Sequence, residues 1–230
     1  MTNGVVTQNR IWRFGGDLAR LAAAVRAGDD DAVVALLRSG GEQLQFVETP
    51  ALSCADLRHE VTATLSEAEA AARGDAGTAL ERLESHRLLC AHRRGPYGVA
   101  RWASEIESWL PSAAGAEWAP GRPLLITAND YDAGLYNGDT GVVIQTPDGP
   151  RAAFARGDQT VLIPPSRLSE AQPLYAMTVH RSQGSQFDRV SLVLPPETSP
   201  LLTRELFYIA VTRPRAGCAS WVARKPSGRR

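Results

Sequence analysis

Residues 173–194, PLYAMTVHRSQGSQFDRVSLVL, give the clearest indication of how this chain folds. Two apolar runs, 173–177 and 190–194, have the length of short buried strands. The loop between them, 178–188, is dense in hydroxyl and amide side chains and holds one histidine, one arginine and one glycine. Glycine, serine, glutamine and aspartate are ordinary turn residues, so the loop taken alone indicates only a connection between strands.

Segments outside this stretch alternate between helical and strand-like patterns. The first helix shows this well, because Leu18, Leu21, Ala22 and Val25 recur at helical spacing behind Asp17. The expected helices are 17–27, 32–38, one that begins at Ser53, 97–110 and 201–212, and the expected strands are 44–47, 87–91, 124–126, 173–177, 190–194 and 218–223. Such alternation predicts an α/β fold, a parallel sheet with helices on both faces.

The pattern changes after about residue 128. Turn signals recur at Asn137-Gly138-Asp139, Asp148-Gly149 and Gly157-Asp158, each between short β-prone runs. This spacing predicts a small antiparallel β-barrel or meander. The expected organisation is an α/β domain over 1–128 and 172–224, an inserted small antiparallel β-barrel over 129–171, and a basic tail over 225–230.

Composition narrows the class of protein. The chain has 230 residues, of which 43% are hydrophobic and 22% charged, as in ordinary globular proteins. It holds no apolar run of about eighteen residues and no signal-peptide pattern at its start, so we expect no membrane segment. Three widely separated cysteines indicate a reducing, cytoplasmic setting. The net charge of zero weakens the case for strong non-specific binding to nucleic acid.

Two kinds of site are disfavoured by the sequence. His86, Cys90 and His92 could be metal ligands, but Leu88-Leu89-Cys90 has the pattern of a buried strand, so we predict no metal site. Lys225 is the one lysine among 25 basic residues, and no GxxxxGK[ST] pattern surrounds it. Because a phosphate-binding loop of that type needs its lysine, this sequence contains none.

Five stretches, in order, resemble RecD-type superfamily 1 DNA helicases, the alpha subunits of exodeoxyribonuclease V. Two of them resemble the fifth and sixth helicase motifs, and another resembles the start of the second motor domain. The five stretches are QNRIWRFGGDLARLAAAV (8–25), RLLCAHRRGPYGVARWASEIESWL (87–110), GRPLLITANDYDAGLYNGDTGVVI (121–144), YAMTVHRSQGSQFD (175–188) and RELFYIAVTRPR (204–215). The resemblance implies a RecA-like second motor domain that carries a small Src-homology-type barrel.

This resemblance implies that the loop 178–188 binds two ligands, single-stranded DNA and ATP. Its hydroxyl and imidazole groups can donate to DNA phosphates, contacts that position a strand without reading its sequence. The implied single-stranded DNA-binding residues are Thr178, His180 and Ser182, and the implied ATP-binding residues are Gln183, Gly184 and Gln186. Glycine at 184 would let the backbone approach a phosphate closely. The simpler alternative for His180 is a structural hydrogen bond.

Arg13 and Arg213 are the implied catalytic residues. An arginine that reaches across a domain cleft stabilises the charge that develops on a transferring phosphoryl group, and its planar fork suits two oxygens. The alternative for Arg213 is a surface side chain favoured by the negative end of a helix. ATP and Mg²⁺ are the implied cofactors, bound mainly by a first motor domain that this sequence does not include.

Four positions depart from the family pattern. Gln186 stands in place of the usual glutamate, Pro214 in place of a small residue, Trp12 in place of tyrosine and Arg181 in place of lysine. The loss of a charge at 186 and the proline at 214 bear most directly on activity.

The functional expectation is the second motor domain of a RecD-like 5′-to-3′ DNA helicase in double-strand-break repair or recombination. It would work only beside a first motor domain, supplied by another segment or an upstream polypeptide. The expected partners are single-stranded DNA and RecB- and RecC-like subunits. Two alternatives remain open from the residues: a non-catalytic DNA-binding or assembly module, and an inactive truncated remnant.

Overall fold

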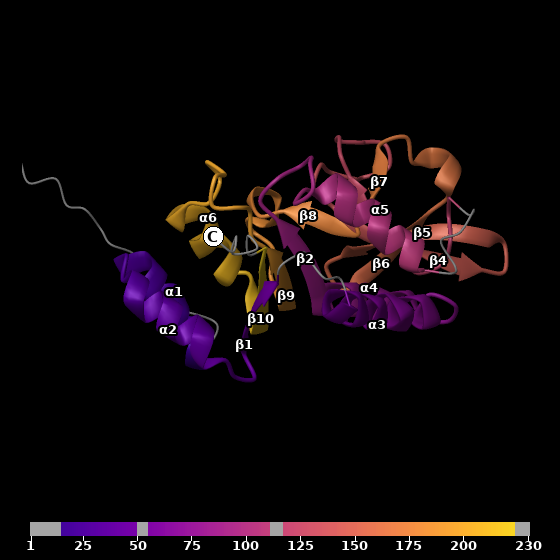
Figure 1. Ribbon diagram of the computed structural model, residues 1–230. Coiled ribbons are helices and arrows are strands. Elements are labelled where there is room, and N and C mark those ends of the chain that lie inside the picture. Colours follow the sequence, from indigo (N-terminus) through magenta and orange to yellow (C-terminus); the bar gives the residue numbers. More distant parts are fainter. Residues whose placement is uncertain (1–14, 50–54, 111–116, 224–230) are drawn as a thin grey trace, which may run out of the picture.

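The computed structural model describes residues 15–49, 55–110 and 117–223 (Figure 1). The helices are α1 (Gly16–Ala27), α2 (Asp30–Ser39), α3 (Ala55–Ala71), α4 (Ala76–Ser85), α5 (Val99–Trp109) and α6 (Arg204–Val211), with 3₁₀ turns η2 (Pro165–Arg167) and η3 (His180–Ser182). The strands are β1 (Leu44–Thr49), β2 (His86–Cys90), β3 (Pro123–Ile126), β4 (Thr140–Thr146), β5 (Gly149–Arg156), β6 (Gln159–Ile163), β7 (Ala171–Pro173), β8 (Ala176–Thr178), β9 (Phe187–Val193) and β10 (Pro214–Ala223). The basic tail lies outside the described residues.

Five strands form a parallel sheet in the order β1-β10-β9-β2-β8. Every pairing in it is parallel, including β2 with β9 and β2 with β8. The two apolar runs of the opening stretch are therefore strands of one sheet, although β2 lies between them. This confirms the parallel α/β sheet that the sequence predicts.

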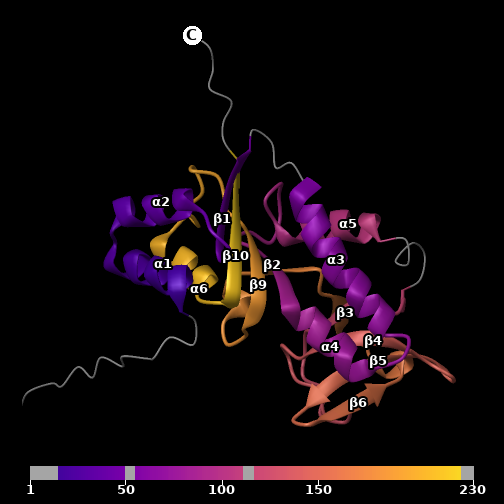
Figure 2. The ribbon, with the colours of Figure 1, turned by 90° about the horizontal axis from the view of Figure 1, so that it is seen from below.

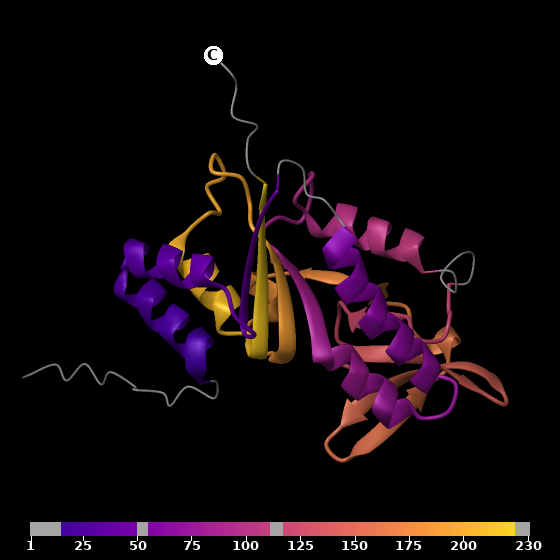
Figure 3. The same cartoon turned by 60° about the horizontal axis from the view of Figure 1, so that its bottom comes forward.

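Helices cover both faces of this sheet. On β9, Val190 and Leu192 pack in one core cluster with Leu18 and Leu21 of α1, whereas Val193 packs in the other. The second cluster contains residues of α3, α4 and α5. Figures 2 and 3 show α1, α2 and α6 on one side of the sheet and α3, α4 and α5 on the other. Alternate side chains of each strand thus face opposite layers of helices.

Local signals explain several helix ends. The helix α1 ends at Gly28, whose φ of 73° places it in the left-handed region that glycine adopts readily. The Asp29 carboxylate then accepts a hydrogen bond from the Ala32 amide and caps α2. Asp75 caps α4 in the same way, through the amides of Gly77 and Thr78. The helix α4 was not expected from the sequence. No helix of the described residues is long and apolar enough to cross a membrane.

The other five strands form a second, antiparallel sheet in the order β6-β5-β4-β3-β7. Successive side chains of its strands also face opposite sides of the sheet. On β4, Val142 faces the α3–α4 layer, whereas Val143 packs with Phe154 in a separate cluster. Gly141 is required there, since an added Cβ would lie 2.6 Å from the Phe154 ring. We call β3 to β7 and their connections the β-module.

The β-module confirms the expected antiparallel strands, but one of its strands was assigned to the wrong sheet and its closure into a barrel is not confirmed. The apolar run 124–126 was assigned to the α/β sheet, but β3 pairs antiparallel with β4 and β7. A run this short looks the same in either kind of sheet, because its pairing partners lie far away in the sequence. The described pairings end at β6 on one edge and β7 on the other, so a closed barrel is not shown.

Candidate functional site

The loop 178–187 joins β8 to β9 across the neighbouring strand β2. Thr178, at the end of β8, lies opposite Cys90 at the end of β2, whereas Arg189, near the start of β9, lies opposite His86 at the start of β2. Since all three strands are parallel, the loop must return along the whole length of β2. One connection therefore reaches both ends of the sheet.

Gly184 has a left-handed backbone conformation within this loop. Its φ is +92°, a backbone conformation that residues with a side chain rarely adopt. A Cβ added there would meet nothing within 4 Å, so the space beside the glycine is open. The glycine is needed for its conformation, and the open space leaves room for a ligand beside the backbone.

Three of the predicted site residues are accessible on this loop. Gln183 and His180 are exposed, and Thr178 is half-buried. The Thr178 hydroxyl oxygen accepts a hydrogen bond from the Arg181 amide at 3.3 Å, which begins the short turn η3. These side chains can still offer donors to a ligand on the outer surface of the loop.

Ser182 is placed differently from its predicted role. Its side chain is fully buried, and its hydroxyl donates to the Val179 carbonyl at 2.7 Å. A hydroxyl used in this way stabilises the turn and does not face a phosphate in solvent. The sequence pattern shows that a serine is present, but not whether its side chain points into the protein or toward solvent.

Arg213 follows α6 and lies against the same loop. Its Nε donates to the Ile209 carbonyl at 3.0 Å, and its Nη1 donates to the Ser185 carbonyl at 3.2 Å. Its Nη2 donates to the Thr212 hydroxyl at 3.1 Å. Burial lowers the pKa of this arginine from its ordinary value. The structure therefore brings the two predicted motifs together, with the guanidinium bound to the loop's backbone.

The second predicted catalytic arginine, Arg13, lies outside the described residues, as does Trp12. Arg20, on the described part of the first helix, is exposed and forms an ion pair with Asp17. The structure therefore places one of the two arginine candidates.

Gln186 lies in a cavity of about 190 Å³ between the parallel sheet and the β-module. The cavity is lined by three arginines and one carboxylate, together with small, polar and apolar residues. The lining residues are Glu84, Arg87, Leu125, Gly138, Thr140, Leu174, Met177, Arg181, Ser185, Gln186, Phe187 and Arg215. This basic cavity was not expected from the sequence, because its arginines come from three distant segments.

Arg87 is the buried member of that group. Its Nη1 and Nη2 atoms donate to the carbonyls of Leu174 and Leu83, and its guanidinium lies 5.1 Å from the centre of the Phe187 ring. Burial lowers its pKa to about 10, which still leaves it charged at neutral pH. Its Nε has no partner among the described residues. Hydropathy gives no signal for a buried arginine at the start of a strand.

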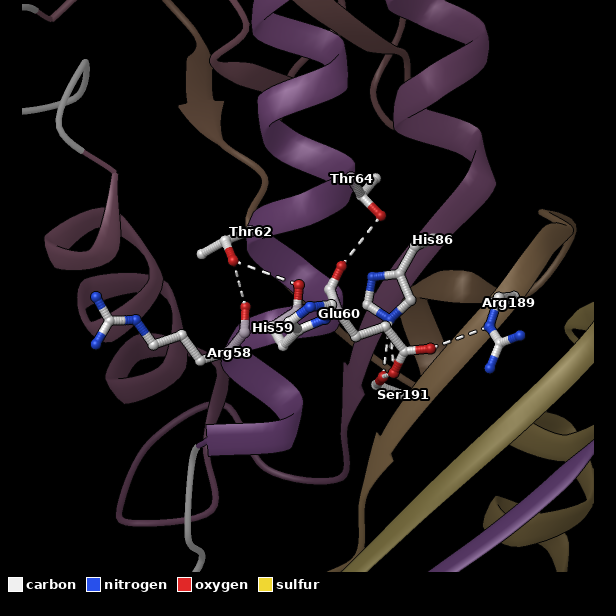
Figure 4. A network of polar contacts seen from close by, with 8 residues as sticks. All are labelled: Arg58, His59, Glu60, Thr62, Thr64, His86, Arg189 and Ser191. Carbon is white, nitrogen blue, oxygen red and sulfur yellow. Dashed lines mark hydrogen bonds and ion pairs between the residues drawn. The ribbon is translucent and has the colours of Figure 1, made fainter.

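A buried polar network lies on the α3 side of the sheet (Figure 4). His86 Nε2 lies 2.7 Å from the Ser191 hydroxyl, which donates to the Glu60 carboxylate at 3.0 Å. The carboxylate also accepts from Arg189. Since the serine hydrogen is used on the carboxylate, the serine oxygen must accept from Nε2–H, and His86 is the donor. Burial lowers the pKa of His86 to about 4, so the ring is neutral at pH 7.

This network is structural rather than nucleophilic. Ser191 is completely buried, and the Glu60 carboxylate lies on the same ring nitrogen of His86 as the serine. A nucleophilic triad needs the carboxylate on the opposite ring nitrogen and an accessible hydroxyl. The Nε2 atom of His86 is thus bonded to Ser191, and that of His92 lies 2.9 Å from the Ser199 hydroxyl.

The chain is similar in sequence to known helicase proteins. A family model of the UvrD-like helicase C-terminal domain matches residues 173–219. The RecBCD enzyme subunit RecD of Mycolicibacterium smegmatis is 47% identical over 217 residues, which are 92% of this chain and 38% of that protein. The ATP-dependent RecD2 DNA helicase of Deinococcus radiodurans is 33% identical over 144 residues, 58% of this chain and 20% of that protein.

Among solved structures, a crystal structure of Bacteroides Pif1 bound to single-stranded DNA has a TM-score of 0.43 and 16% identity, and the match covers 92% of this chain and 50% of that one. The chain spans little more than a third of the length of the mycobacterial relative that it matches over most of its own length.

Proposed function

Because the chain is a homologue of RecD subunits over most of its length, we propose that it is the second motor domain of a RecD-like, ATP-dependent 5′-to-3′ DNA helicase. The proposed role is in double-strand-break repair or recombination. The motor domain comprises the parallel sheet and its helices, with the β-module as an insertion. This domain works beside a first motor domain that carries the phosphate loop.

The observation that carries the proposal is the contact between Arg213 and the loop 178–187. A helicase motor must link the nucleotide to the nucleic acid, and here one loop reaches both ends of the sheet. The Arg213 guanidinium is hydrogen-bonded to that loop at Ser185. A movement of the loop therefore shifts the arginine, and a change at the arginine shifts the loop.

The residues present fit one side of an ATP site. Gln183 and Gly184 are exposed beside open space, so an amide side chain and a backbone amide can reach phosphate or water. An arginine has five N–H donors, and among the described residues one hydrogen of Arg213 Nη2 has no acceptor. ATP and Mg²⁺ would be held mainly by the first domain, where the metal neutralises phosphate charge.

The role proposed for Arg213 is to stabilise charge rather than to transfer a proton. Guanidinium remains charged at neutral pH even where burial lowers its pKa. Its contacts to three backbone carbonyls, those of Ser182, Ser185 and Ile209, preorganise it, so little reorganisation is needed when charge develops on the transferring group. We propose the same role for Arg13, and an ATP contact for Gln186, from the resemblance alone.

Thr178 and His180 are the proposed contacts to single-stranded DNA. Both lie on the accessible side of the loop, and both can donate to phosphate oxygens without selecting a base. Ser182 is left out of this proposal because its hydroxyl is buried and used within the turn. The relative from M. smegmatis is named as a RecBCD subunit, so we also propose RecB- and RecC-like partners for the parent protein.

A fusion experiment tests this function. The part of the M. smegmatis relative that lies outside its matched region is joined to this chain, and ATP hydrolysis and strand displacement are measured. The proposal predicts hydrolysis stimulated by single-stranded DNA, and unwinding of duplexes with a 5′ tail but not of those with a 3′ tail. Salt-sensitive DNA binding without hydrolysis in the fusion would favour a non-catalytic DNA-binding module instead.

A further inference from the structure

Two tyrosines of the β-module are left exposed in the connection between β3 and β4. Tyr131 is 77% exposed and Tyr136 is 52% exposed. Their ring centres lie 6.3 Å apart with the planes at 79°, so one ring edge meets the other face. Among the described residues, these are the two aromatic side chains that are both large and exposed. Exposed aromatic rings of this kind mark surfaces that bind a partner.

The segment that carries the tyrosines is held in one conformation. Asp130 and Leu135 exchange backbone hydrogen bonds of 2.8 Å in both directions. Asn129 donates from its amide to the Tyr131 hydroxyl and accepts from the Asn137 amide. A surface fixed before binding loses less conformational entropy when a ligand arrives. The rings are therefore presented on a preorganised platform.

This platform adjoins the loop proposed to bind DNA. Arg181 Nη2 lies 3.5 Å from the Asn137 side-chain oxygen, and Asn137 follows Tyr136 directly. Gly138 of the same connection and Thr140, the first residue of β4, line the basic cavity together with Arg181. A positive charge suited to phosphate thus lies on one side of the tyrosines.

The acidic residues nearby decide which part of a nucleotide can occupy the platform. Asp132 is exposed beside Tyr131, and Asp130 flanks it on the other side. Asp139 is neutralised by an ion pair with Arg156. A phosphate beside Tyr131 would be repelled, whereas an uncharged base would not. We therefore expect the phosphate of the nucleotide to lie at Arg181 and its base to lie at the tyrosines.

We propose that Tyr131 stacks on a base of single-stranded nucleic acid, with Tyr136 packed edge to face against it, and that Arg181 binds the phosphate of that nucleotide. This inference rests on the DNA binding in the proposed function and adds the residues that engage the bases. Stacking of this kind tolerates any base, because every base has a flat aromatic face. The β-module thereby extends the DNA path beyond the loop 178–187.

The test is a salt titration of the full chain with a fluorescein-labelled oligothymidylate, read by anisotropy. Replacing both tyrosines by alanine should weaken binding roughly 5- to 150-fold for each base that stacks, with an unchanged salt slope. Replacing both by phenylalanine keeps the rings and should keep most of the affinity. The Arg181→Gln variant should reduce the slope of log affinity against log salt by about 0.7. Leu162→Ala, an exposed apolar residue on β6, is the matched control and should bind like the unchanged chain.

An abasic oligonucleotide of the same length separates stacking from all other effects. The unchanged chain should bind it more weakly than oligothymidylate, and the double alanine variant should bind both equally. If the double variant binds oligothymidylate like the unchanged chain, or loses affinity for both probes alike, the stacking inference is wrong and the proposed function stands. That result, together with lost binding to a RecB- or RecC-like subunit, would make the tyrosines a protein interface. If the unchanged chain binds neither probe, the DNA contacts of the proposed function fail and the inference falls with them.

Discussion

The Nη1 atom of Arg213 lies 3.2 Å from the carbonyl oxygen of Ser185, a hydrogen bond between the end of α6 and the loop that joins β8 to β9. A second hydrogen bond joins the same loop to Arg213, because the Phe187 amide donates to the Arg213 carbonyl at 3.1 Å. Both ends of the arginine residue are therefore attached to one loop. This arrangement favours an arginine with a defined position over a surface side chain at a helix end.

The chain alone should not hydrolyse ATP, because its sequence contains no phosphate-loop lysine. The measurement is phosphate release with and without single-stranded DNA. DNA-stimulated hydrolysis that co-purifies with the chain, and that Arg213→Ala abolishes, would contradict this expectation. Hydrolysis that Arg213→Ala leaves unchanged would point to a contaminating enzyme.

Gly184→Ala should destabilise the chain by about 1 kcal/mol or more, because alanine is strained at a φ of +92° even though its Cβ meets no other atom. Denaturant titration measures the free energy of unfolding. The control is Gly74→Ala, which also has open space but lacks a positive φ, and which should be neutral or slightly stabilising. Equal effects in the two variants would show that the loop does not require glycine for its conformation.

His86 should make the protein less stable as the pH falls from about 6.5 to about 4. Burial lowers its pKa in the folded chain to about 4, against an ordinary value of 6.5. Within this window the unfolded chain binds a proton that the folded chain does not, so protonation favours unfolding. The shift corresponds to a loss of up to about 3 kcal/mol by the lower end of the window.

The His86→Gln variant checks this contribution. Its unfolding free energy should depend less on pH between 6.5 and 4 than that of the unchanged chain, whatever its absolute stability. His59→Gln is the matched control, since His59 is exposed on α3. The account of the buried network is wrong if both variants show the same pH dependence as the unchanged chain.

Binding to single-stranded DNA should be weak and salt-sensitive, with little preference for sequence. The net charge is zero and the proposed donors are few, so a log–log salt plot should have a shallow slope of roughly −0.7 per phosphate contacted. Thr178→Val and His180→Ala should weaken binding about equally for all sequences. Tight binding with a strong preference for particular bases would exclude this mode of recognition.

Sequence patterns predicted most of the parallel sheet and its helices because the residues of its core recur at regular, short spacings along the chain. Leu18, Leu21 and Val25 recur at helical spacing, and all three are buried in one cluster. Helix α4 was missed because Gly77 weakens its helical pattern, whereas the capping by Asp75 and the burial of Leu83 stabilise it.

The site was predictable in its residue types but not in its orientations. The glycine at 184 and the arginine at 213 follow from the motifs, and the structure brings their segments together. The buried position of Ser182 and the network around His86 depend on contacts between residues far apart in the sequence. Local patterns contain no information on such pairs.

The most direct test of the central claim is ATP hydrolysis by the fusion with a first motor domain, compared with its Arg213→Ala variant. If Arg213 stabilises the transition state, the variant should lose roughly 10³- to 10⁵-fold in turnover while nucleotide binding weakens much less. Arg213→Lys should rescue poorly because it lacks the planar fork, and Arg13→Ala should depress turnover as well. Arg20→Ala removes an exposed ion pair and should be nearly silent. Turnover in Arg213→Ala equal to that in Arg20→Ala would contradict the account, since Arg213 would then be only a structural link between α6 and the loop.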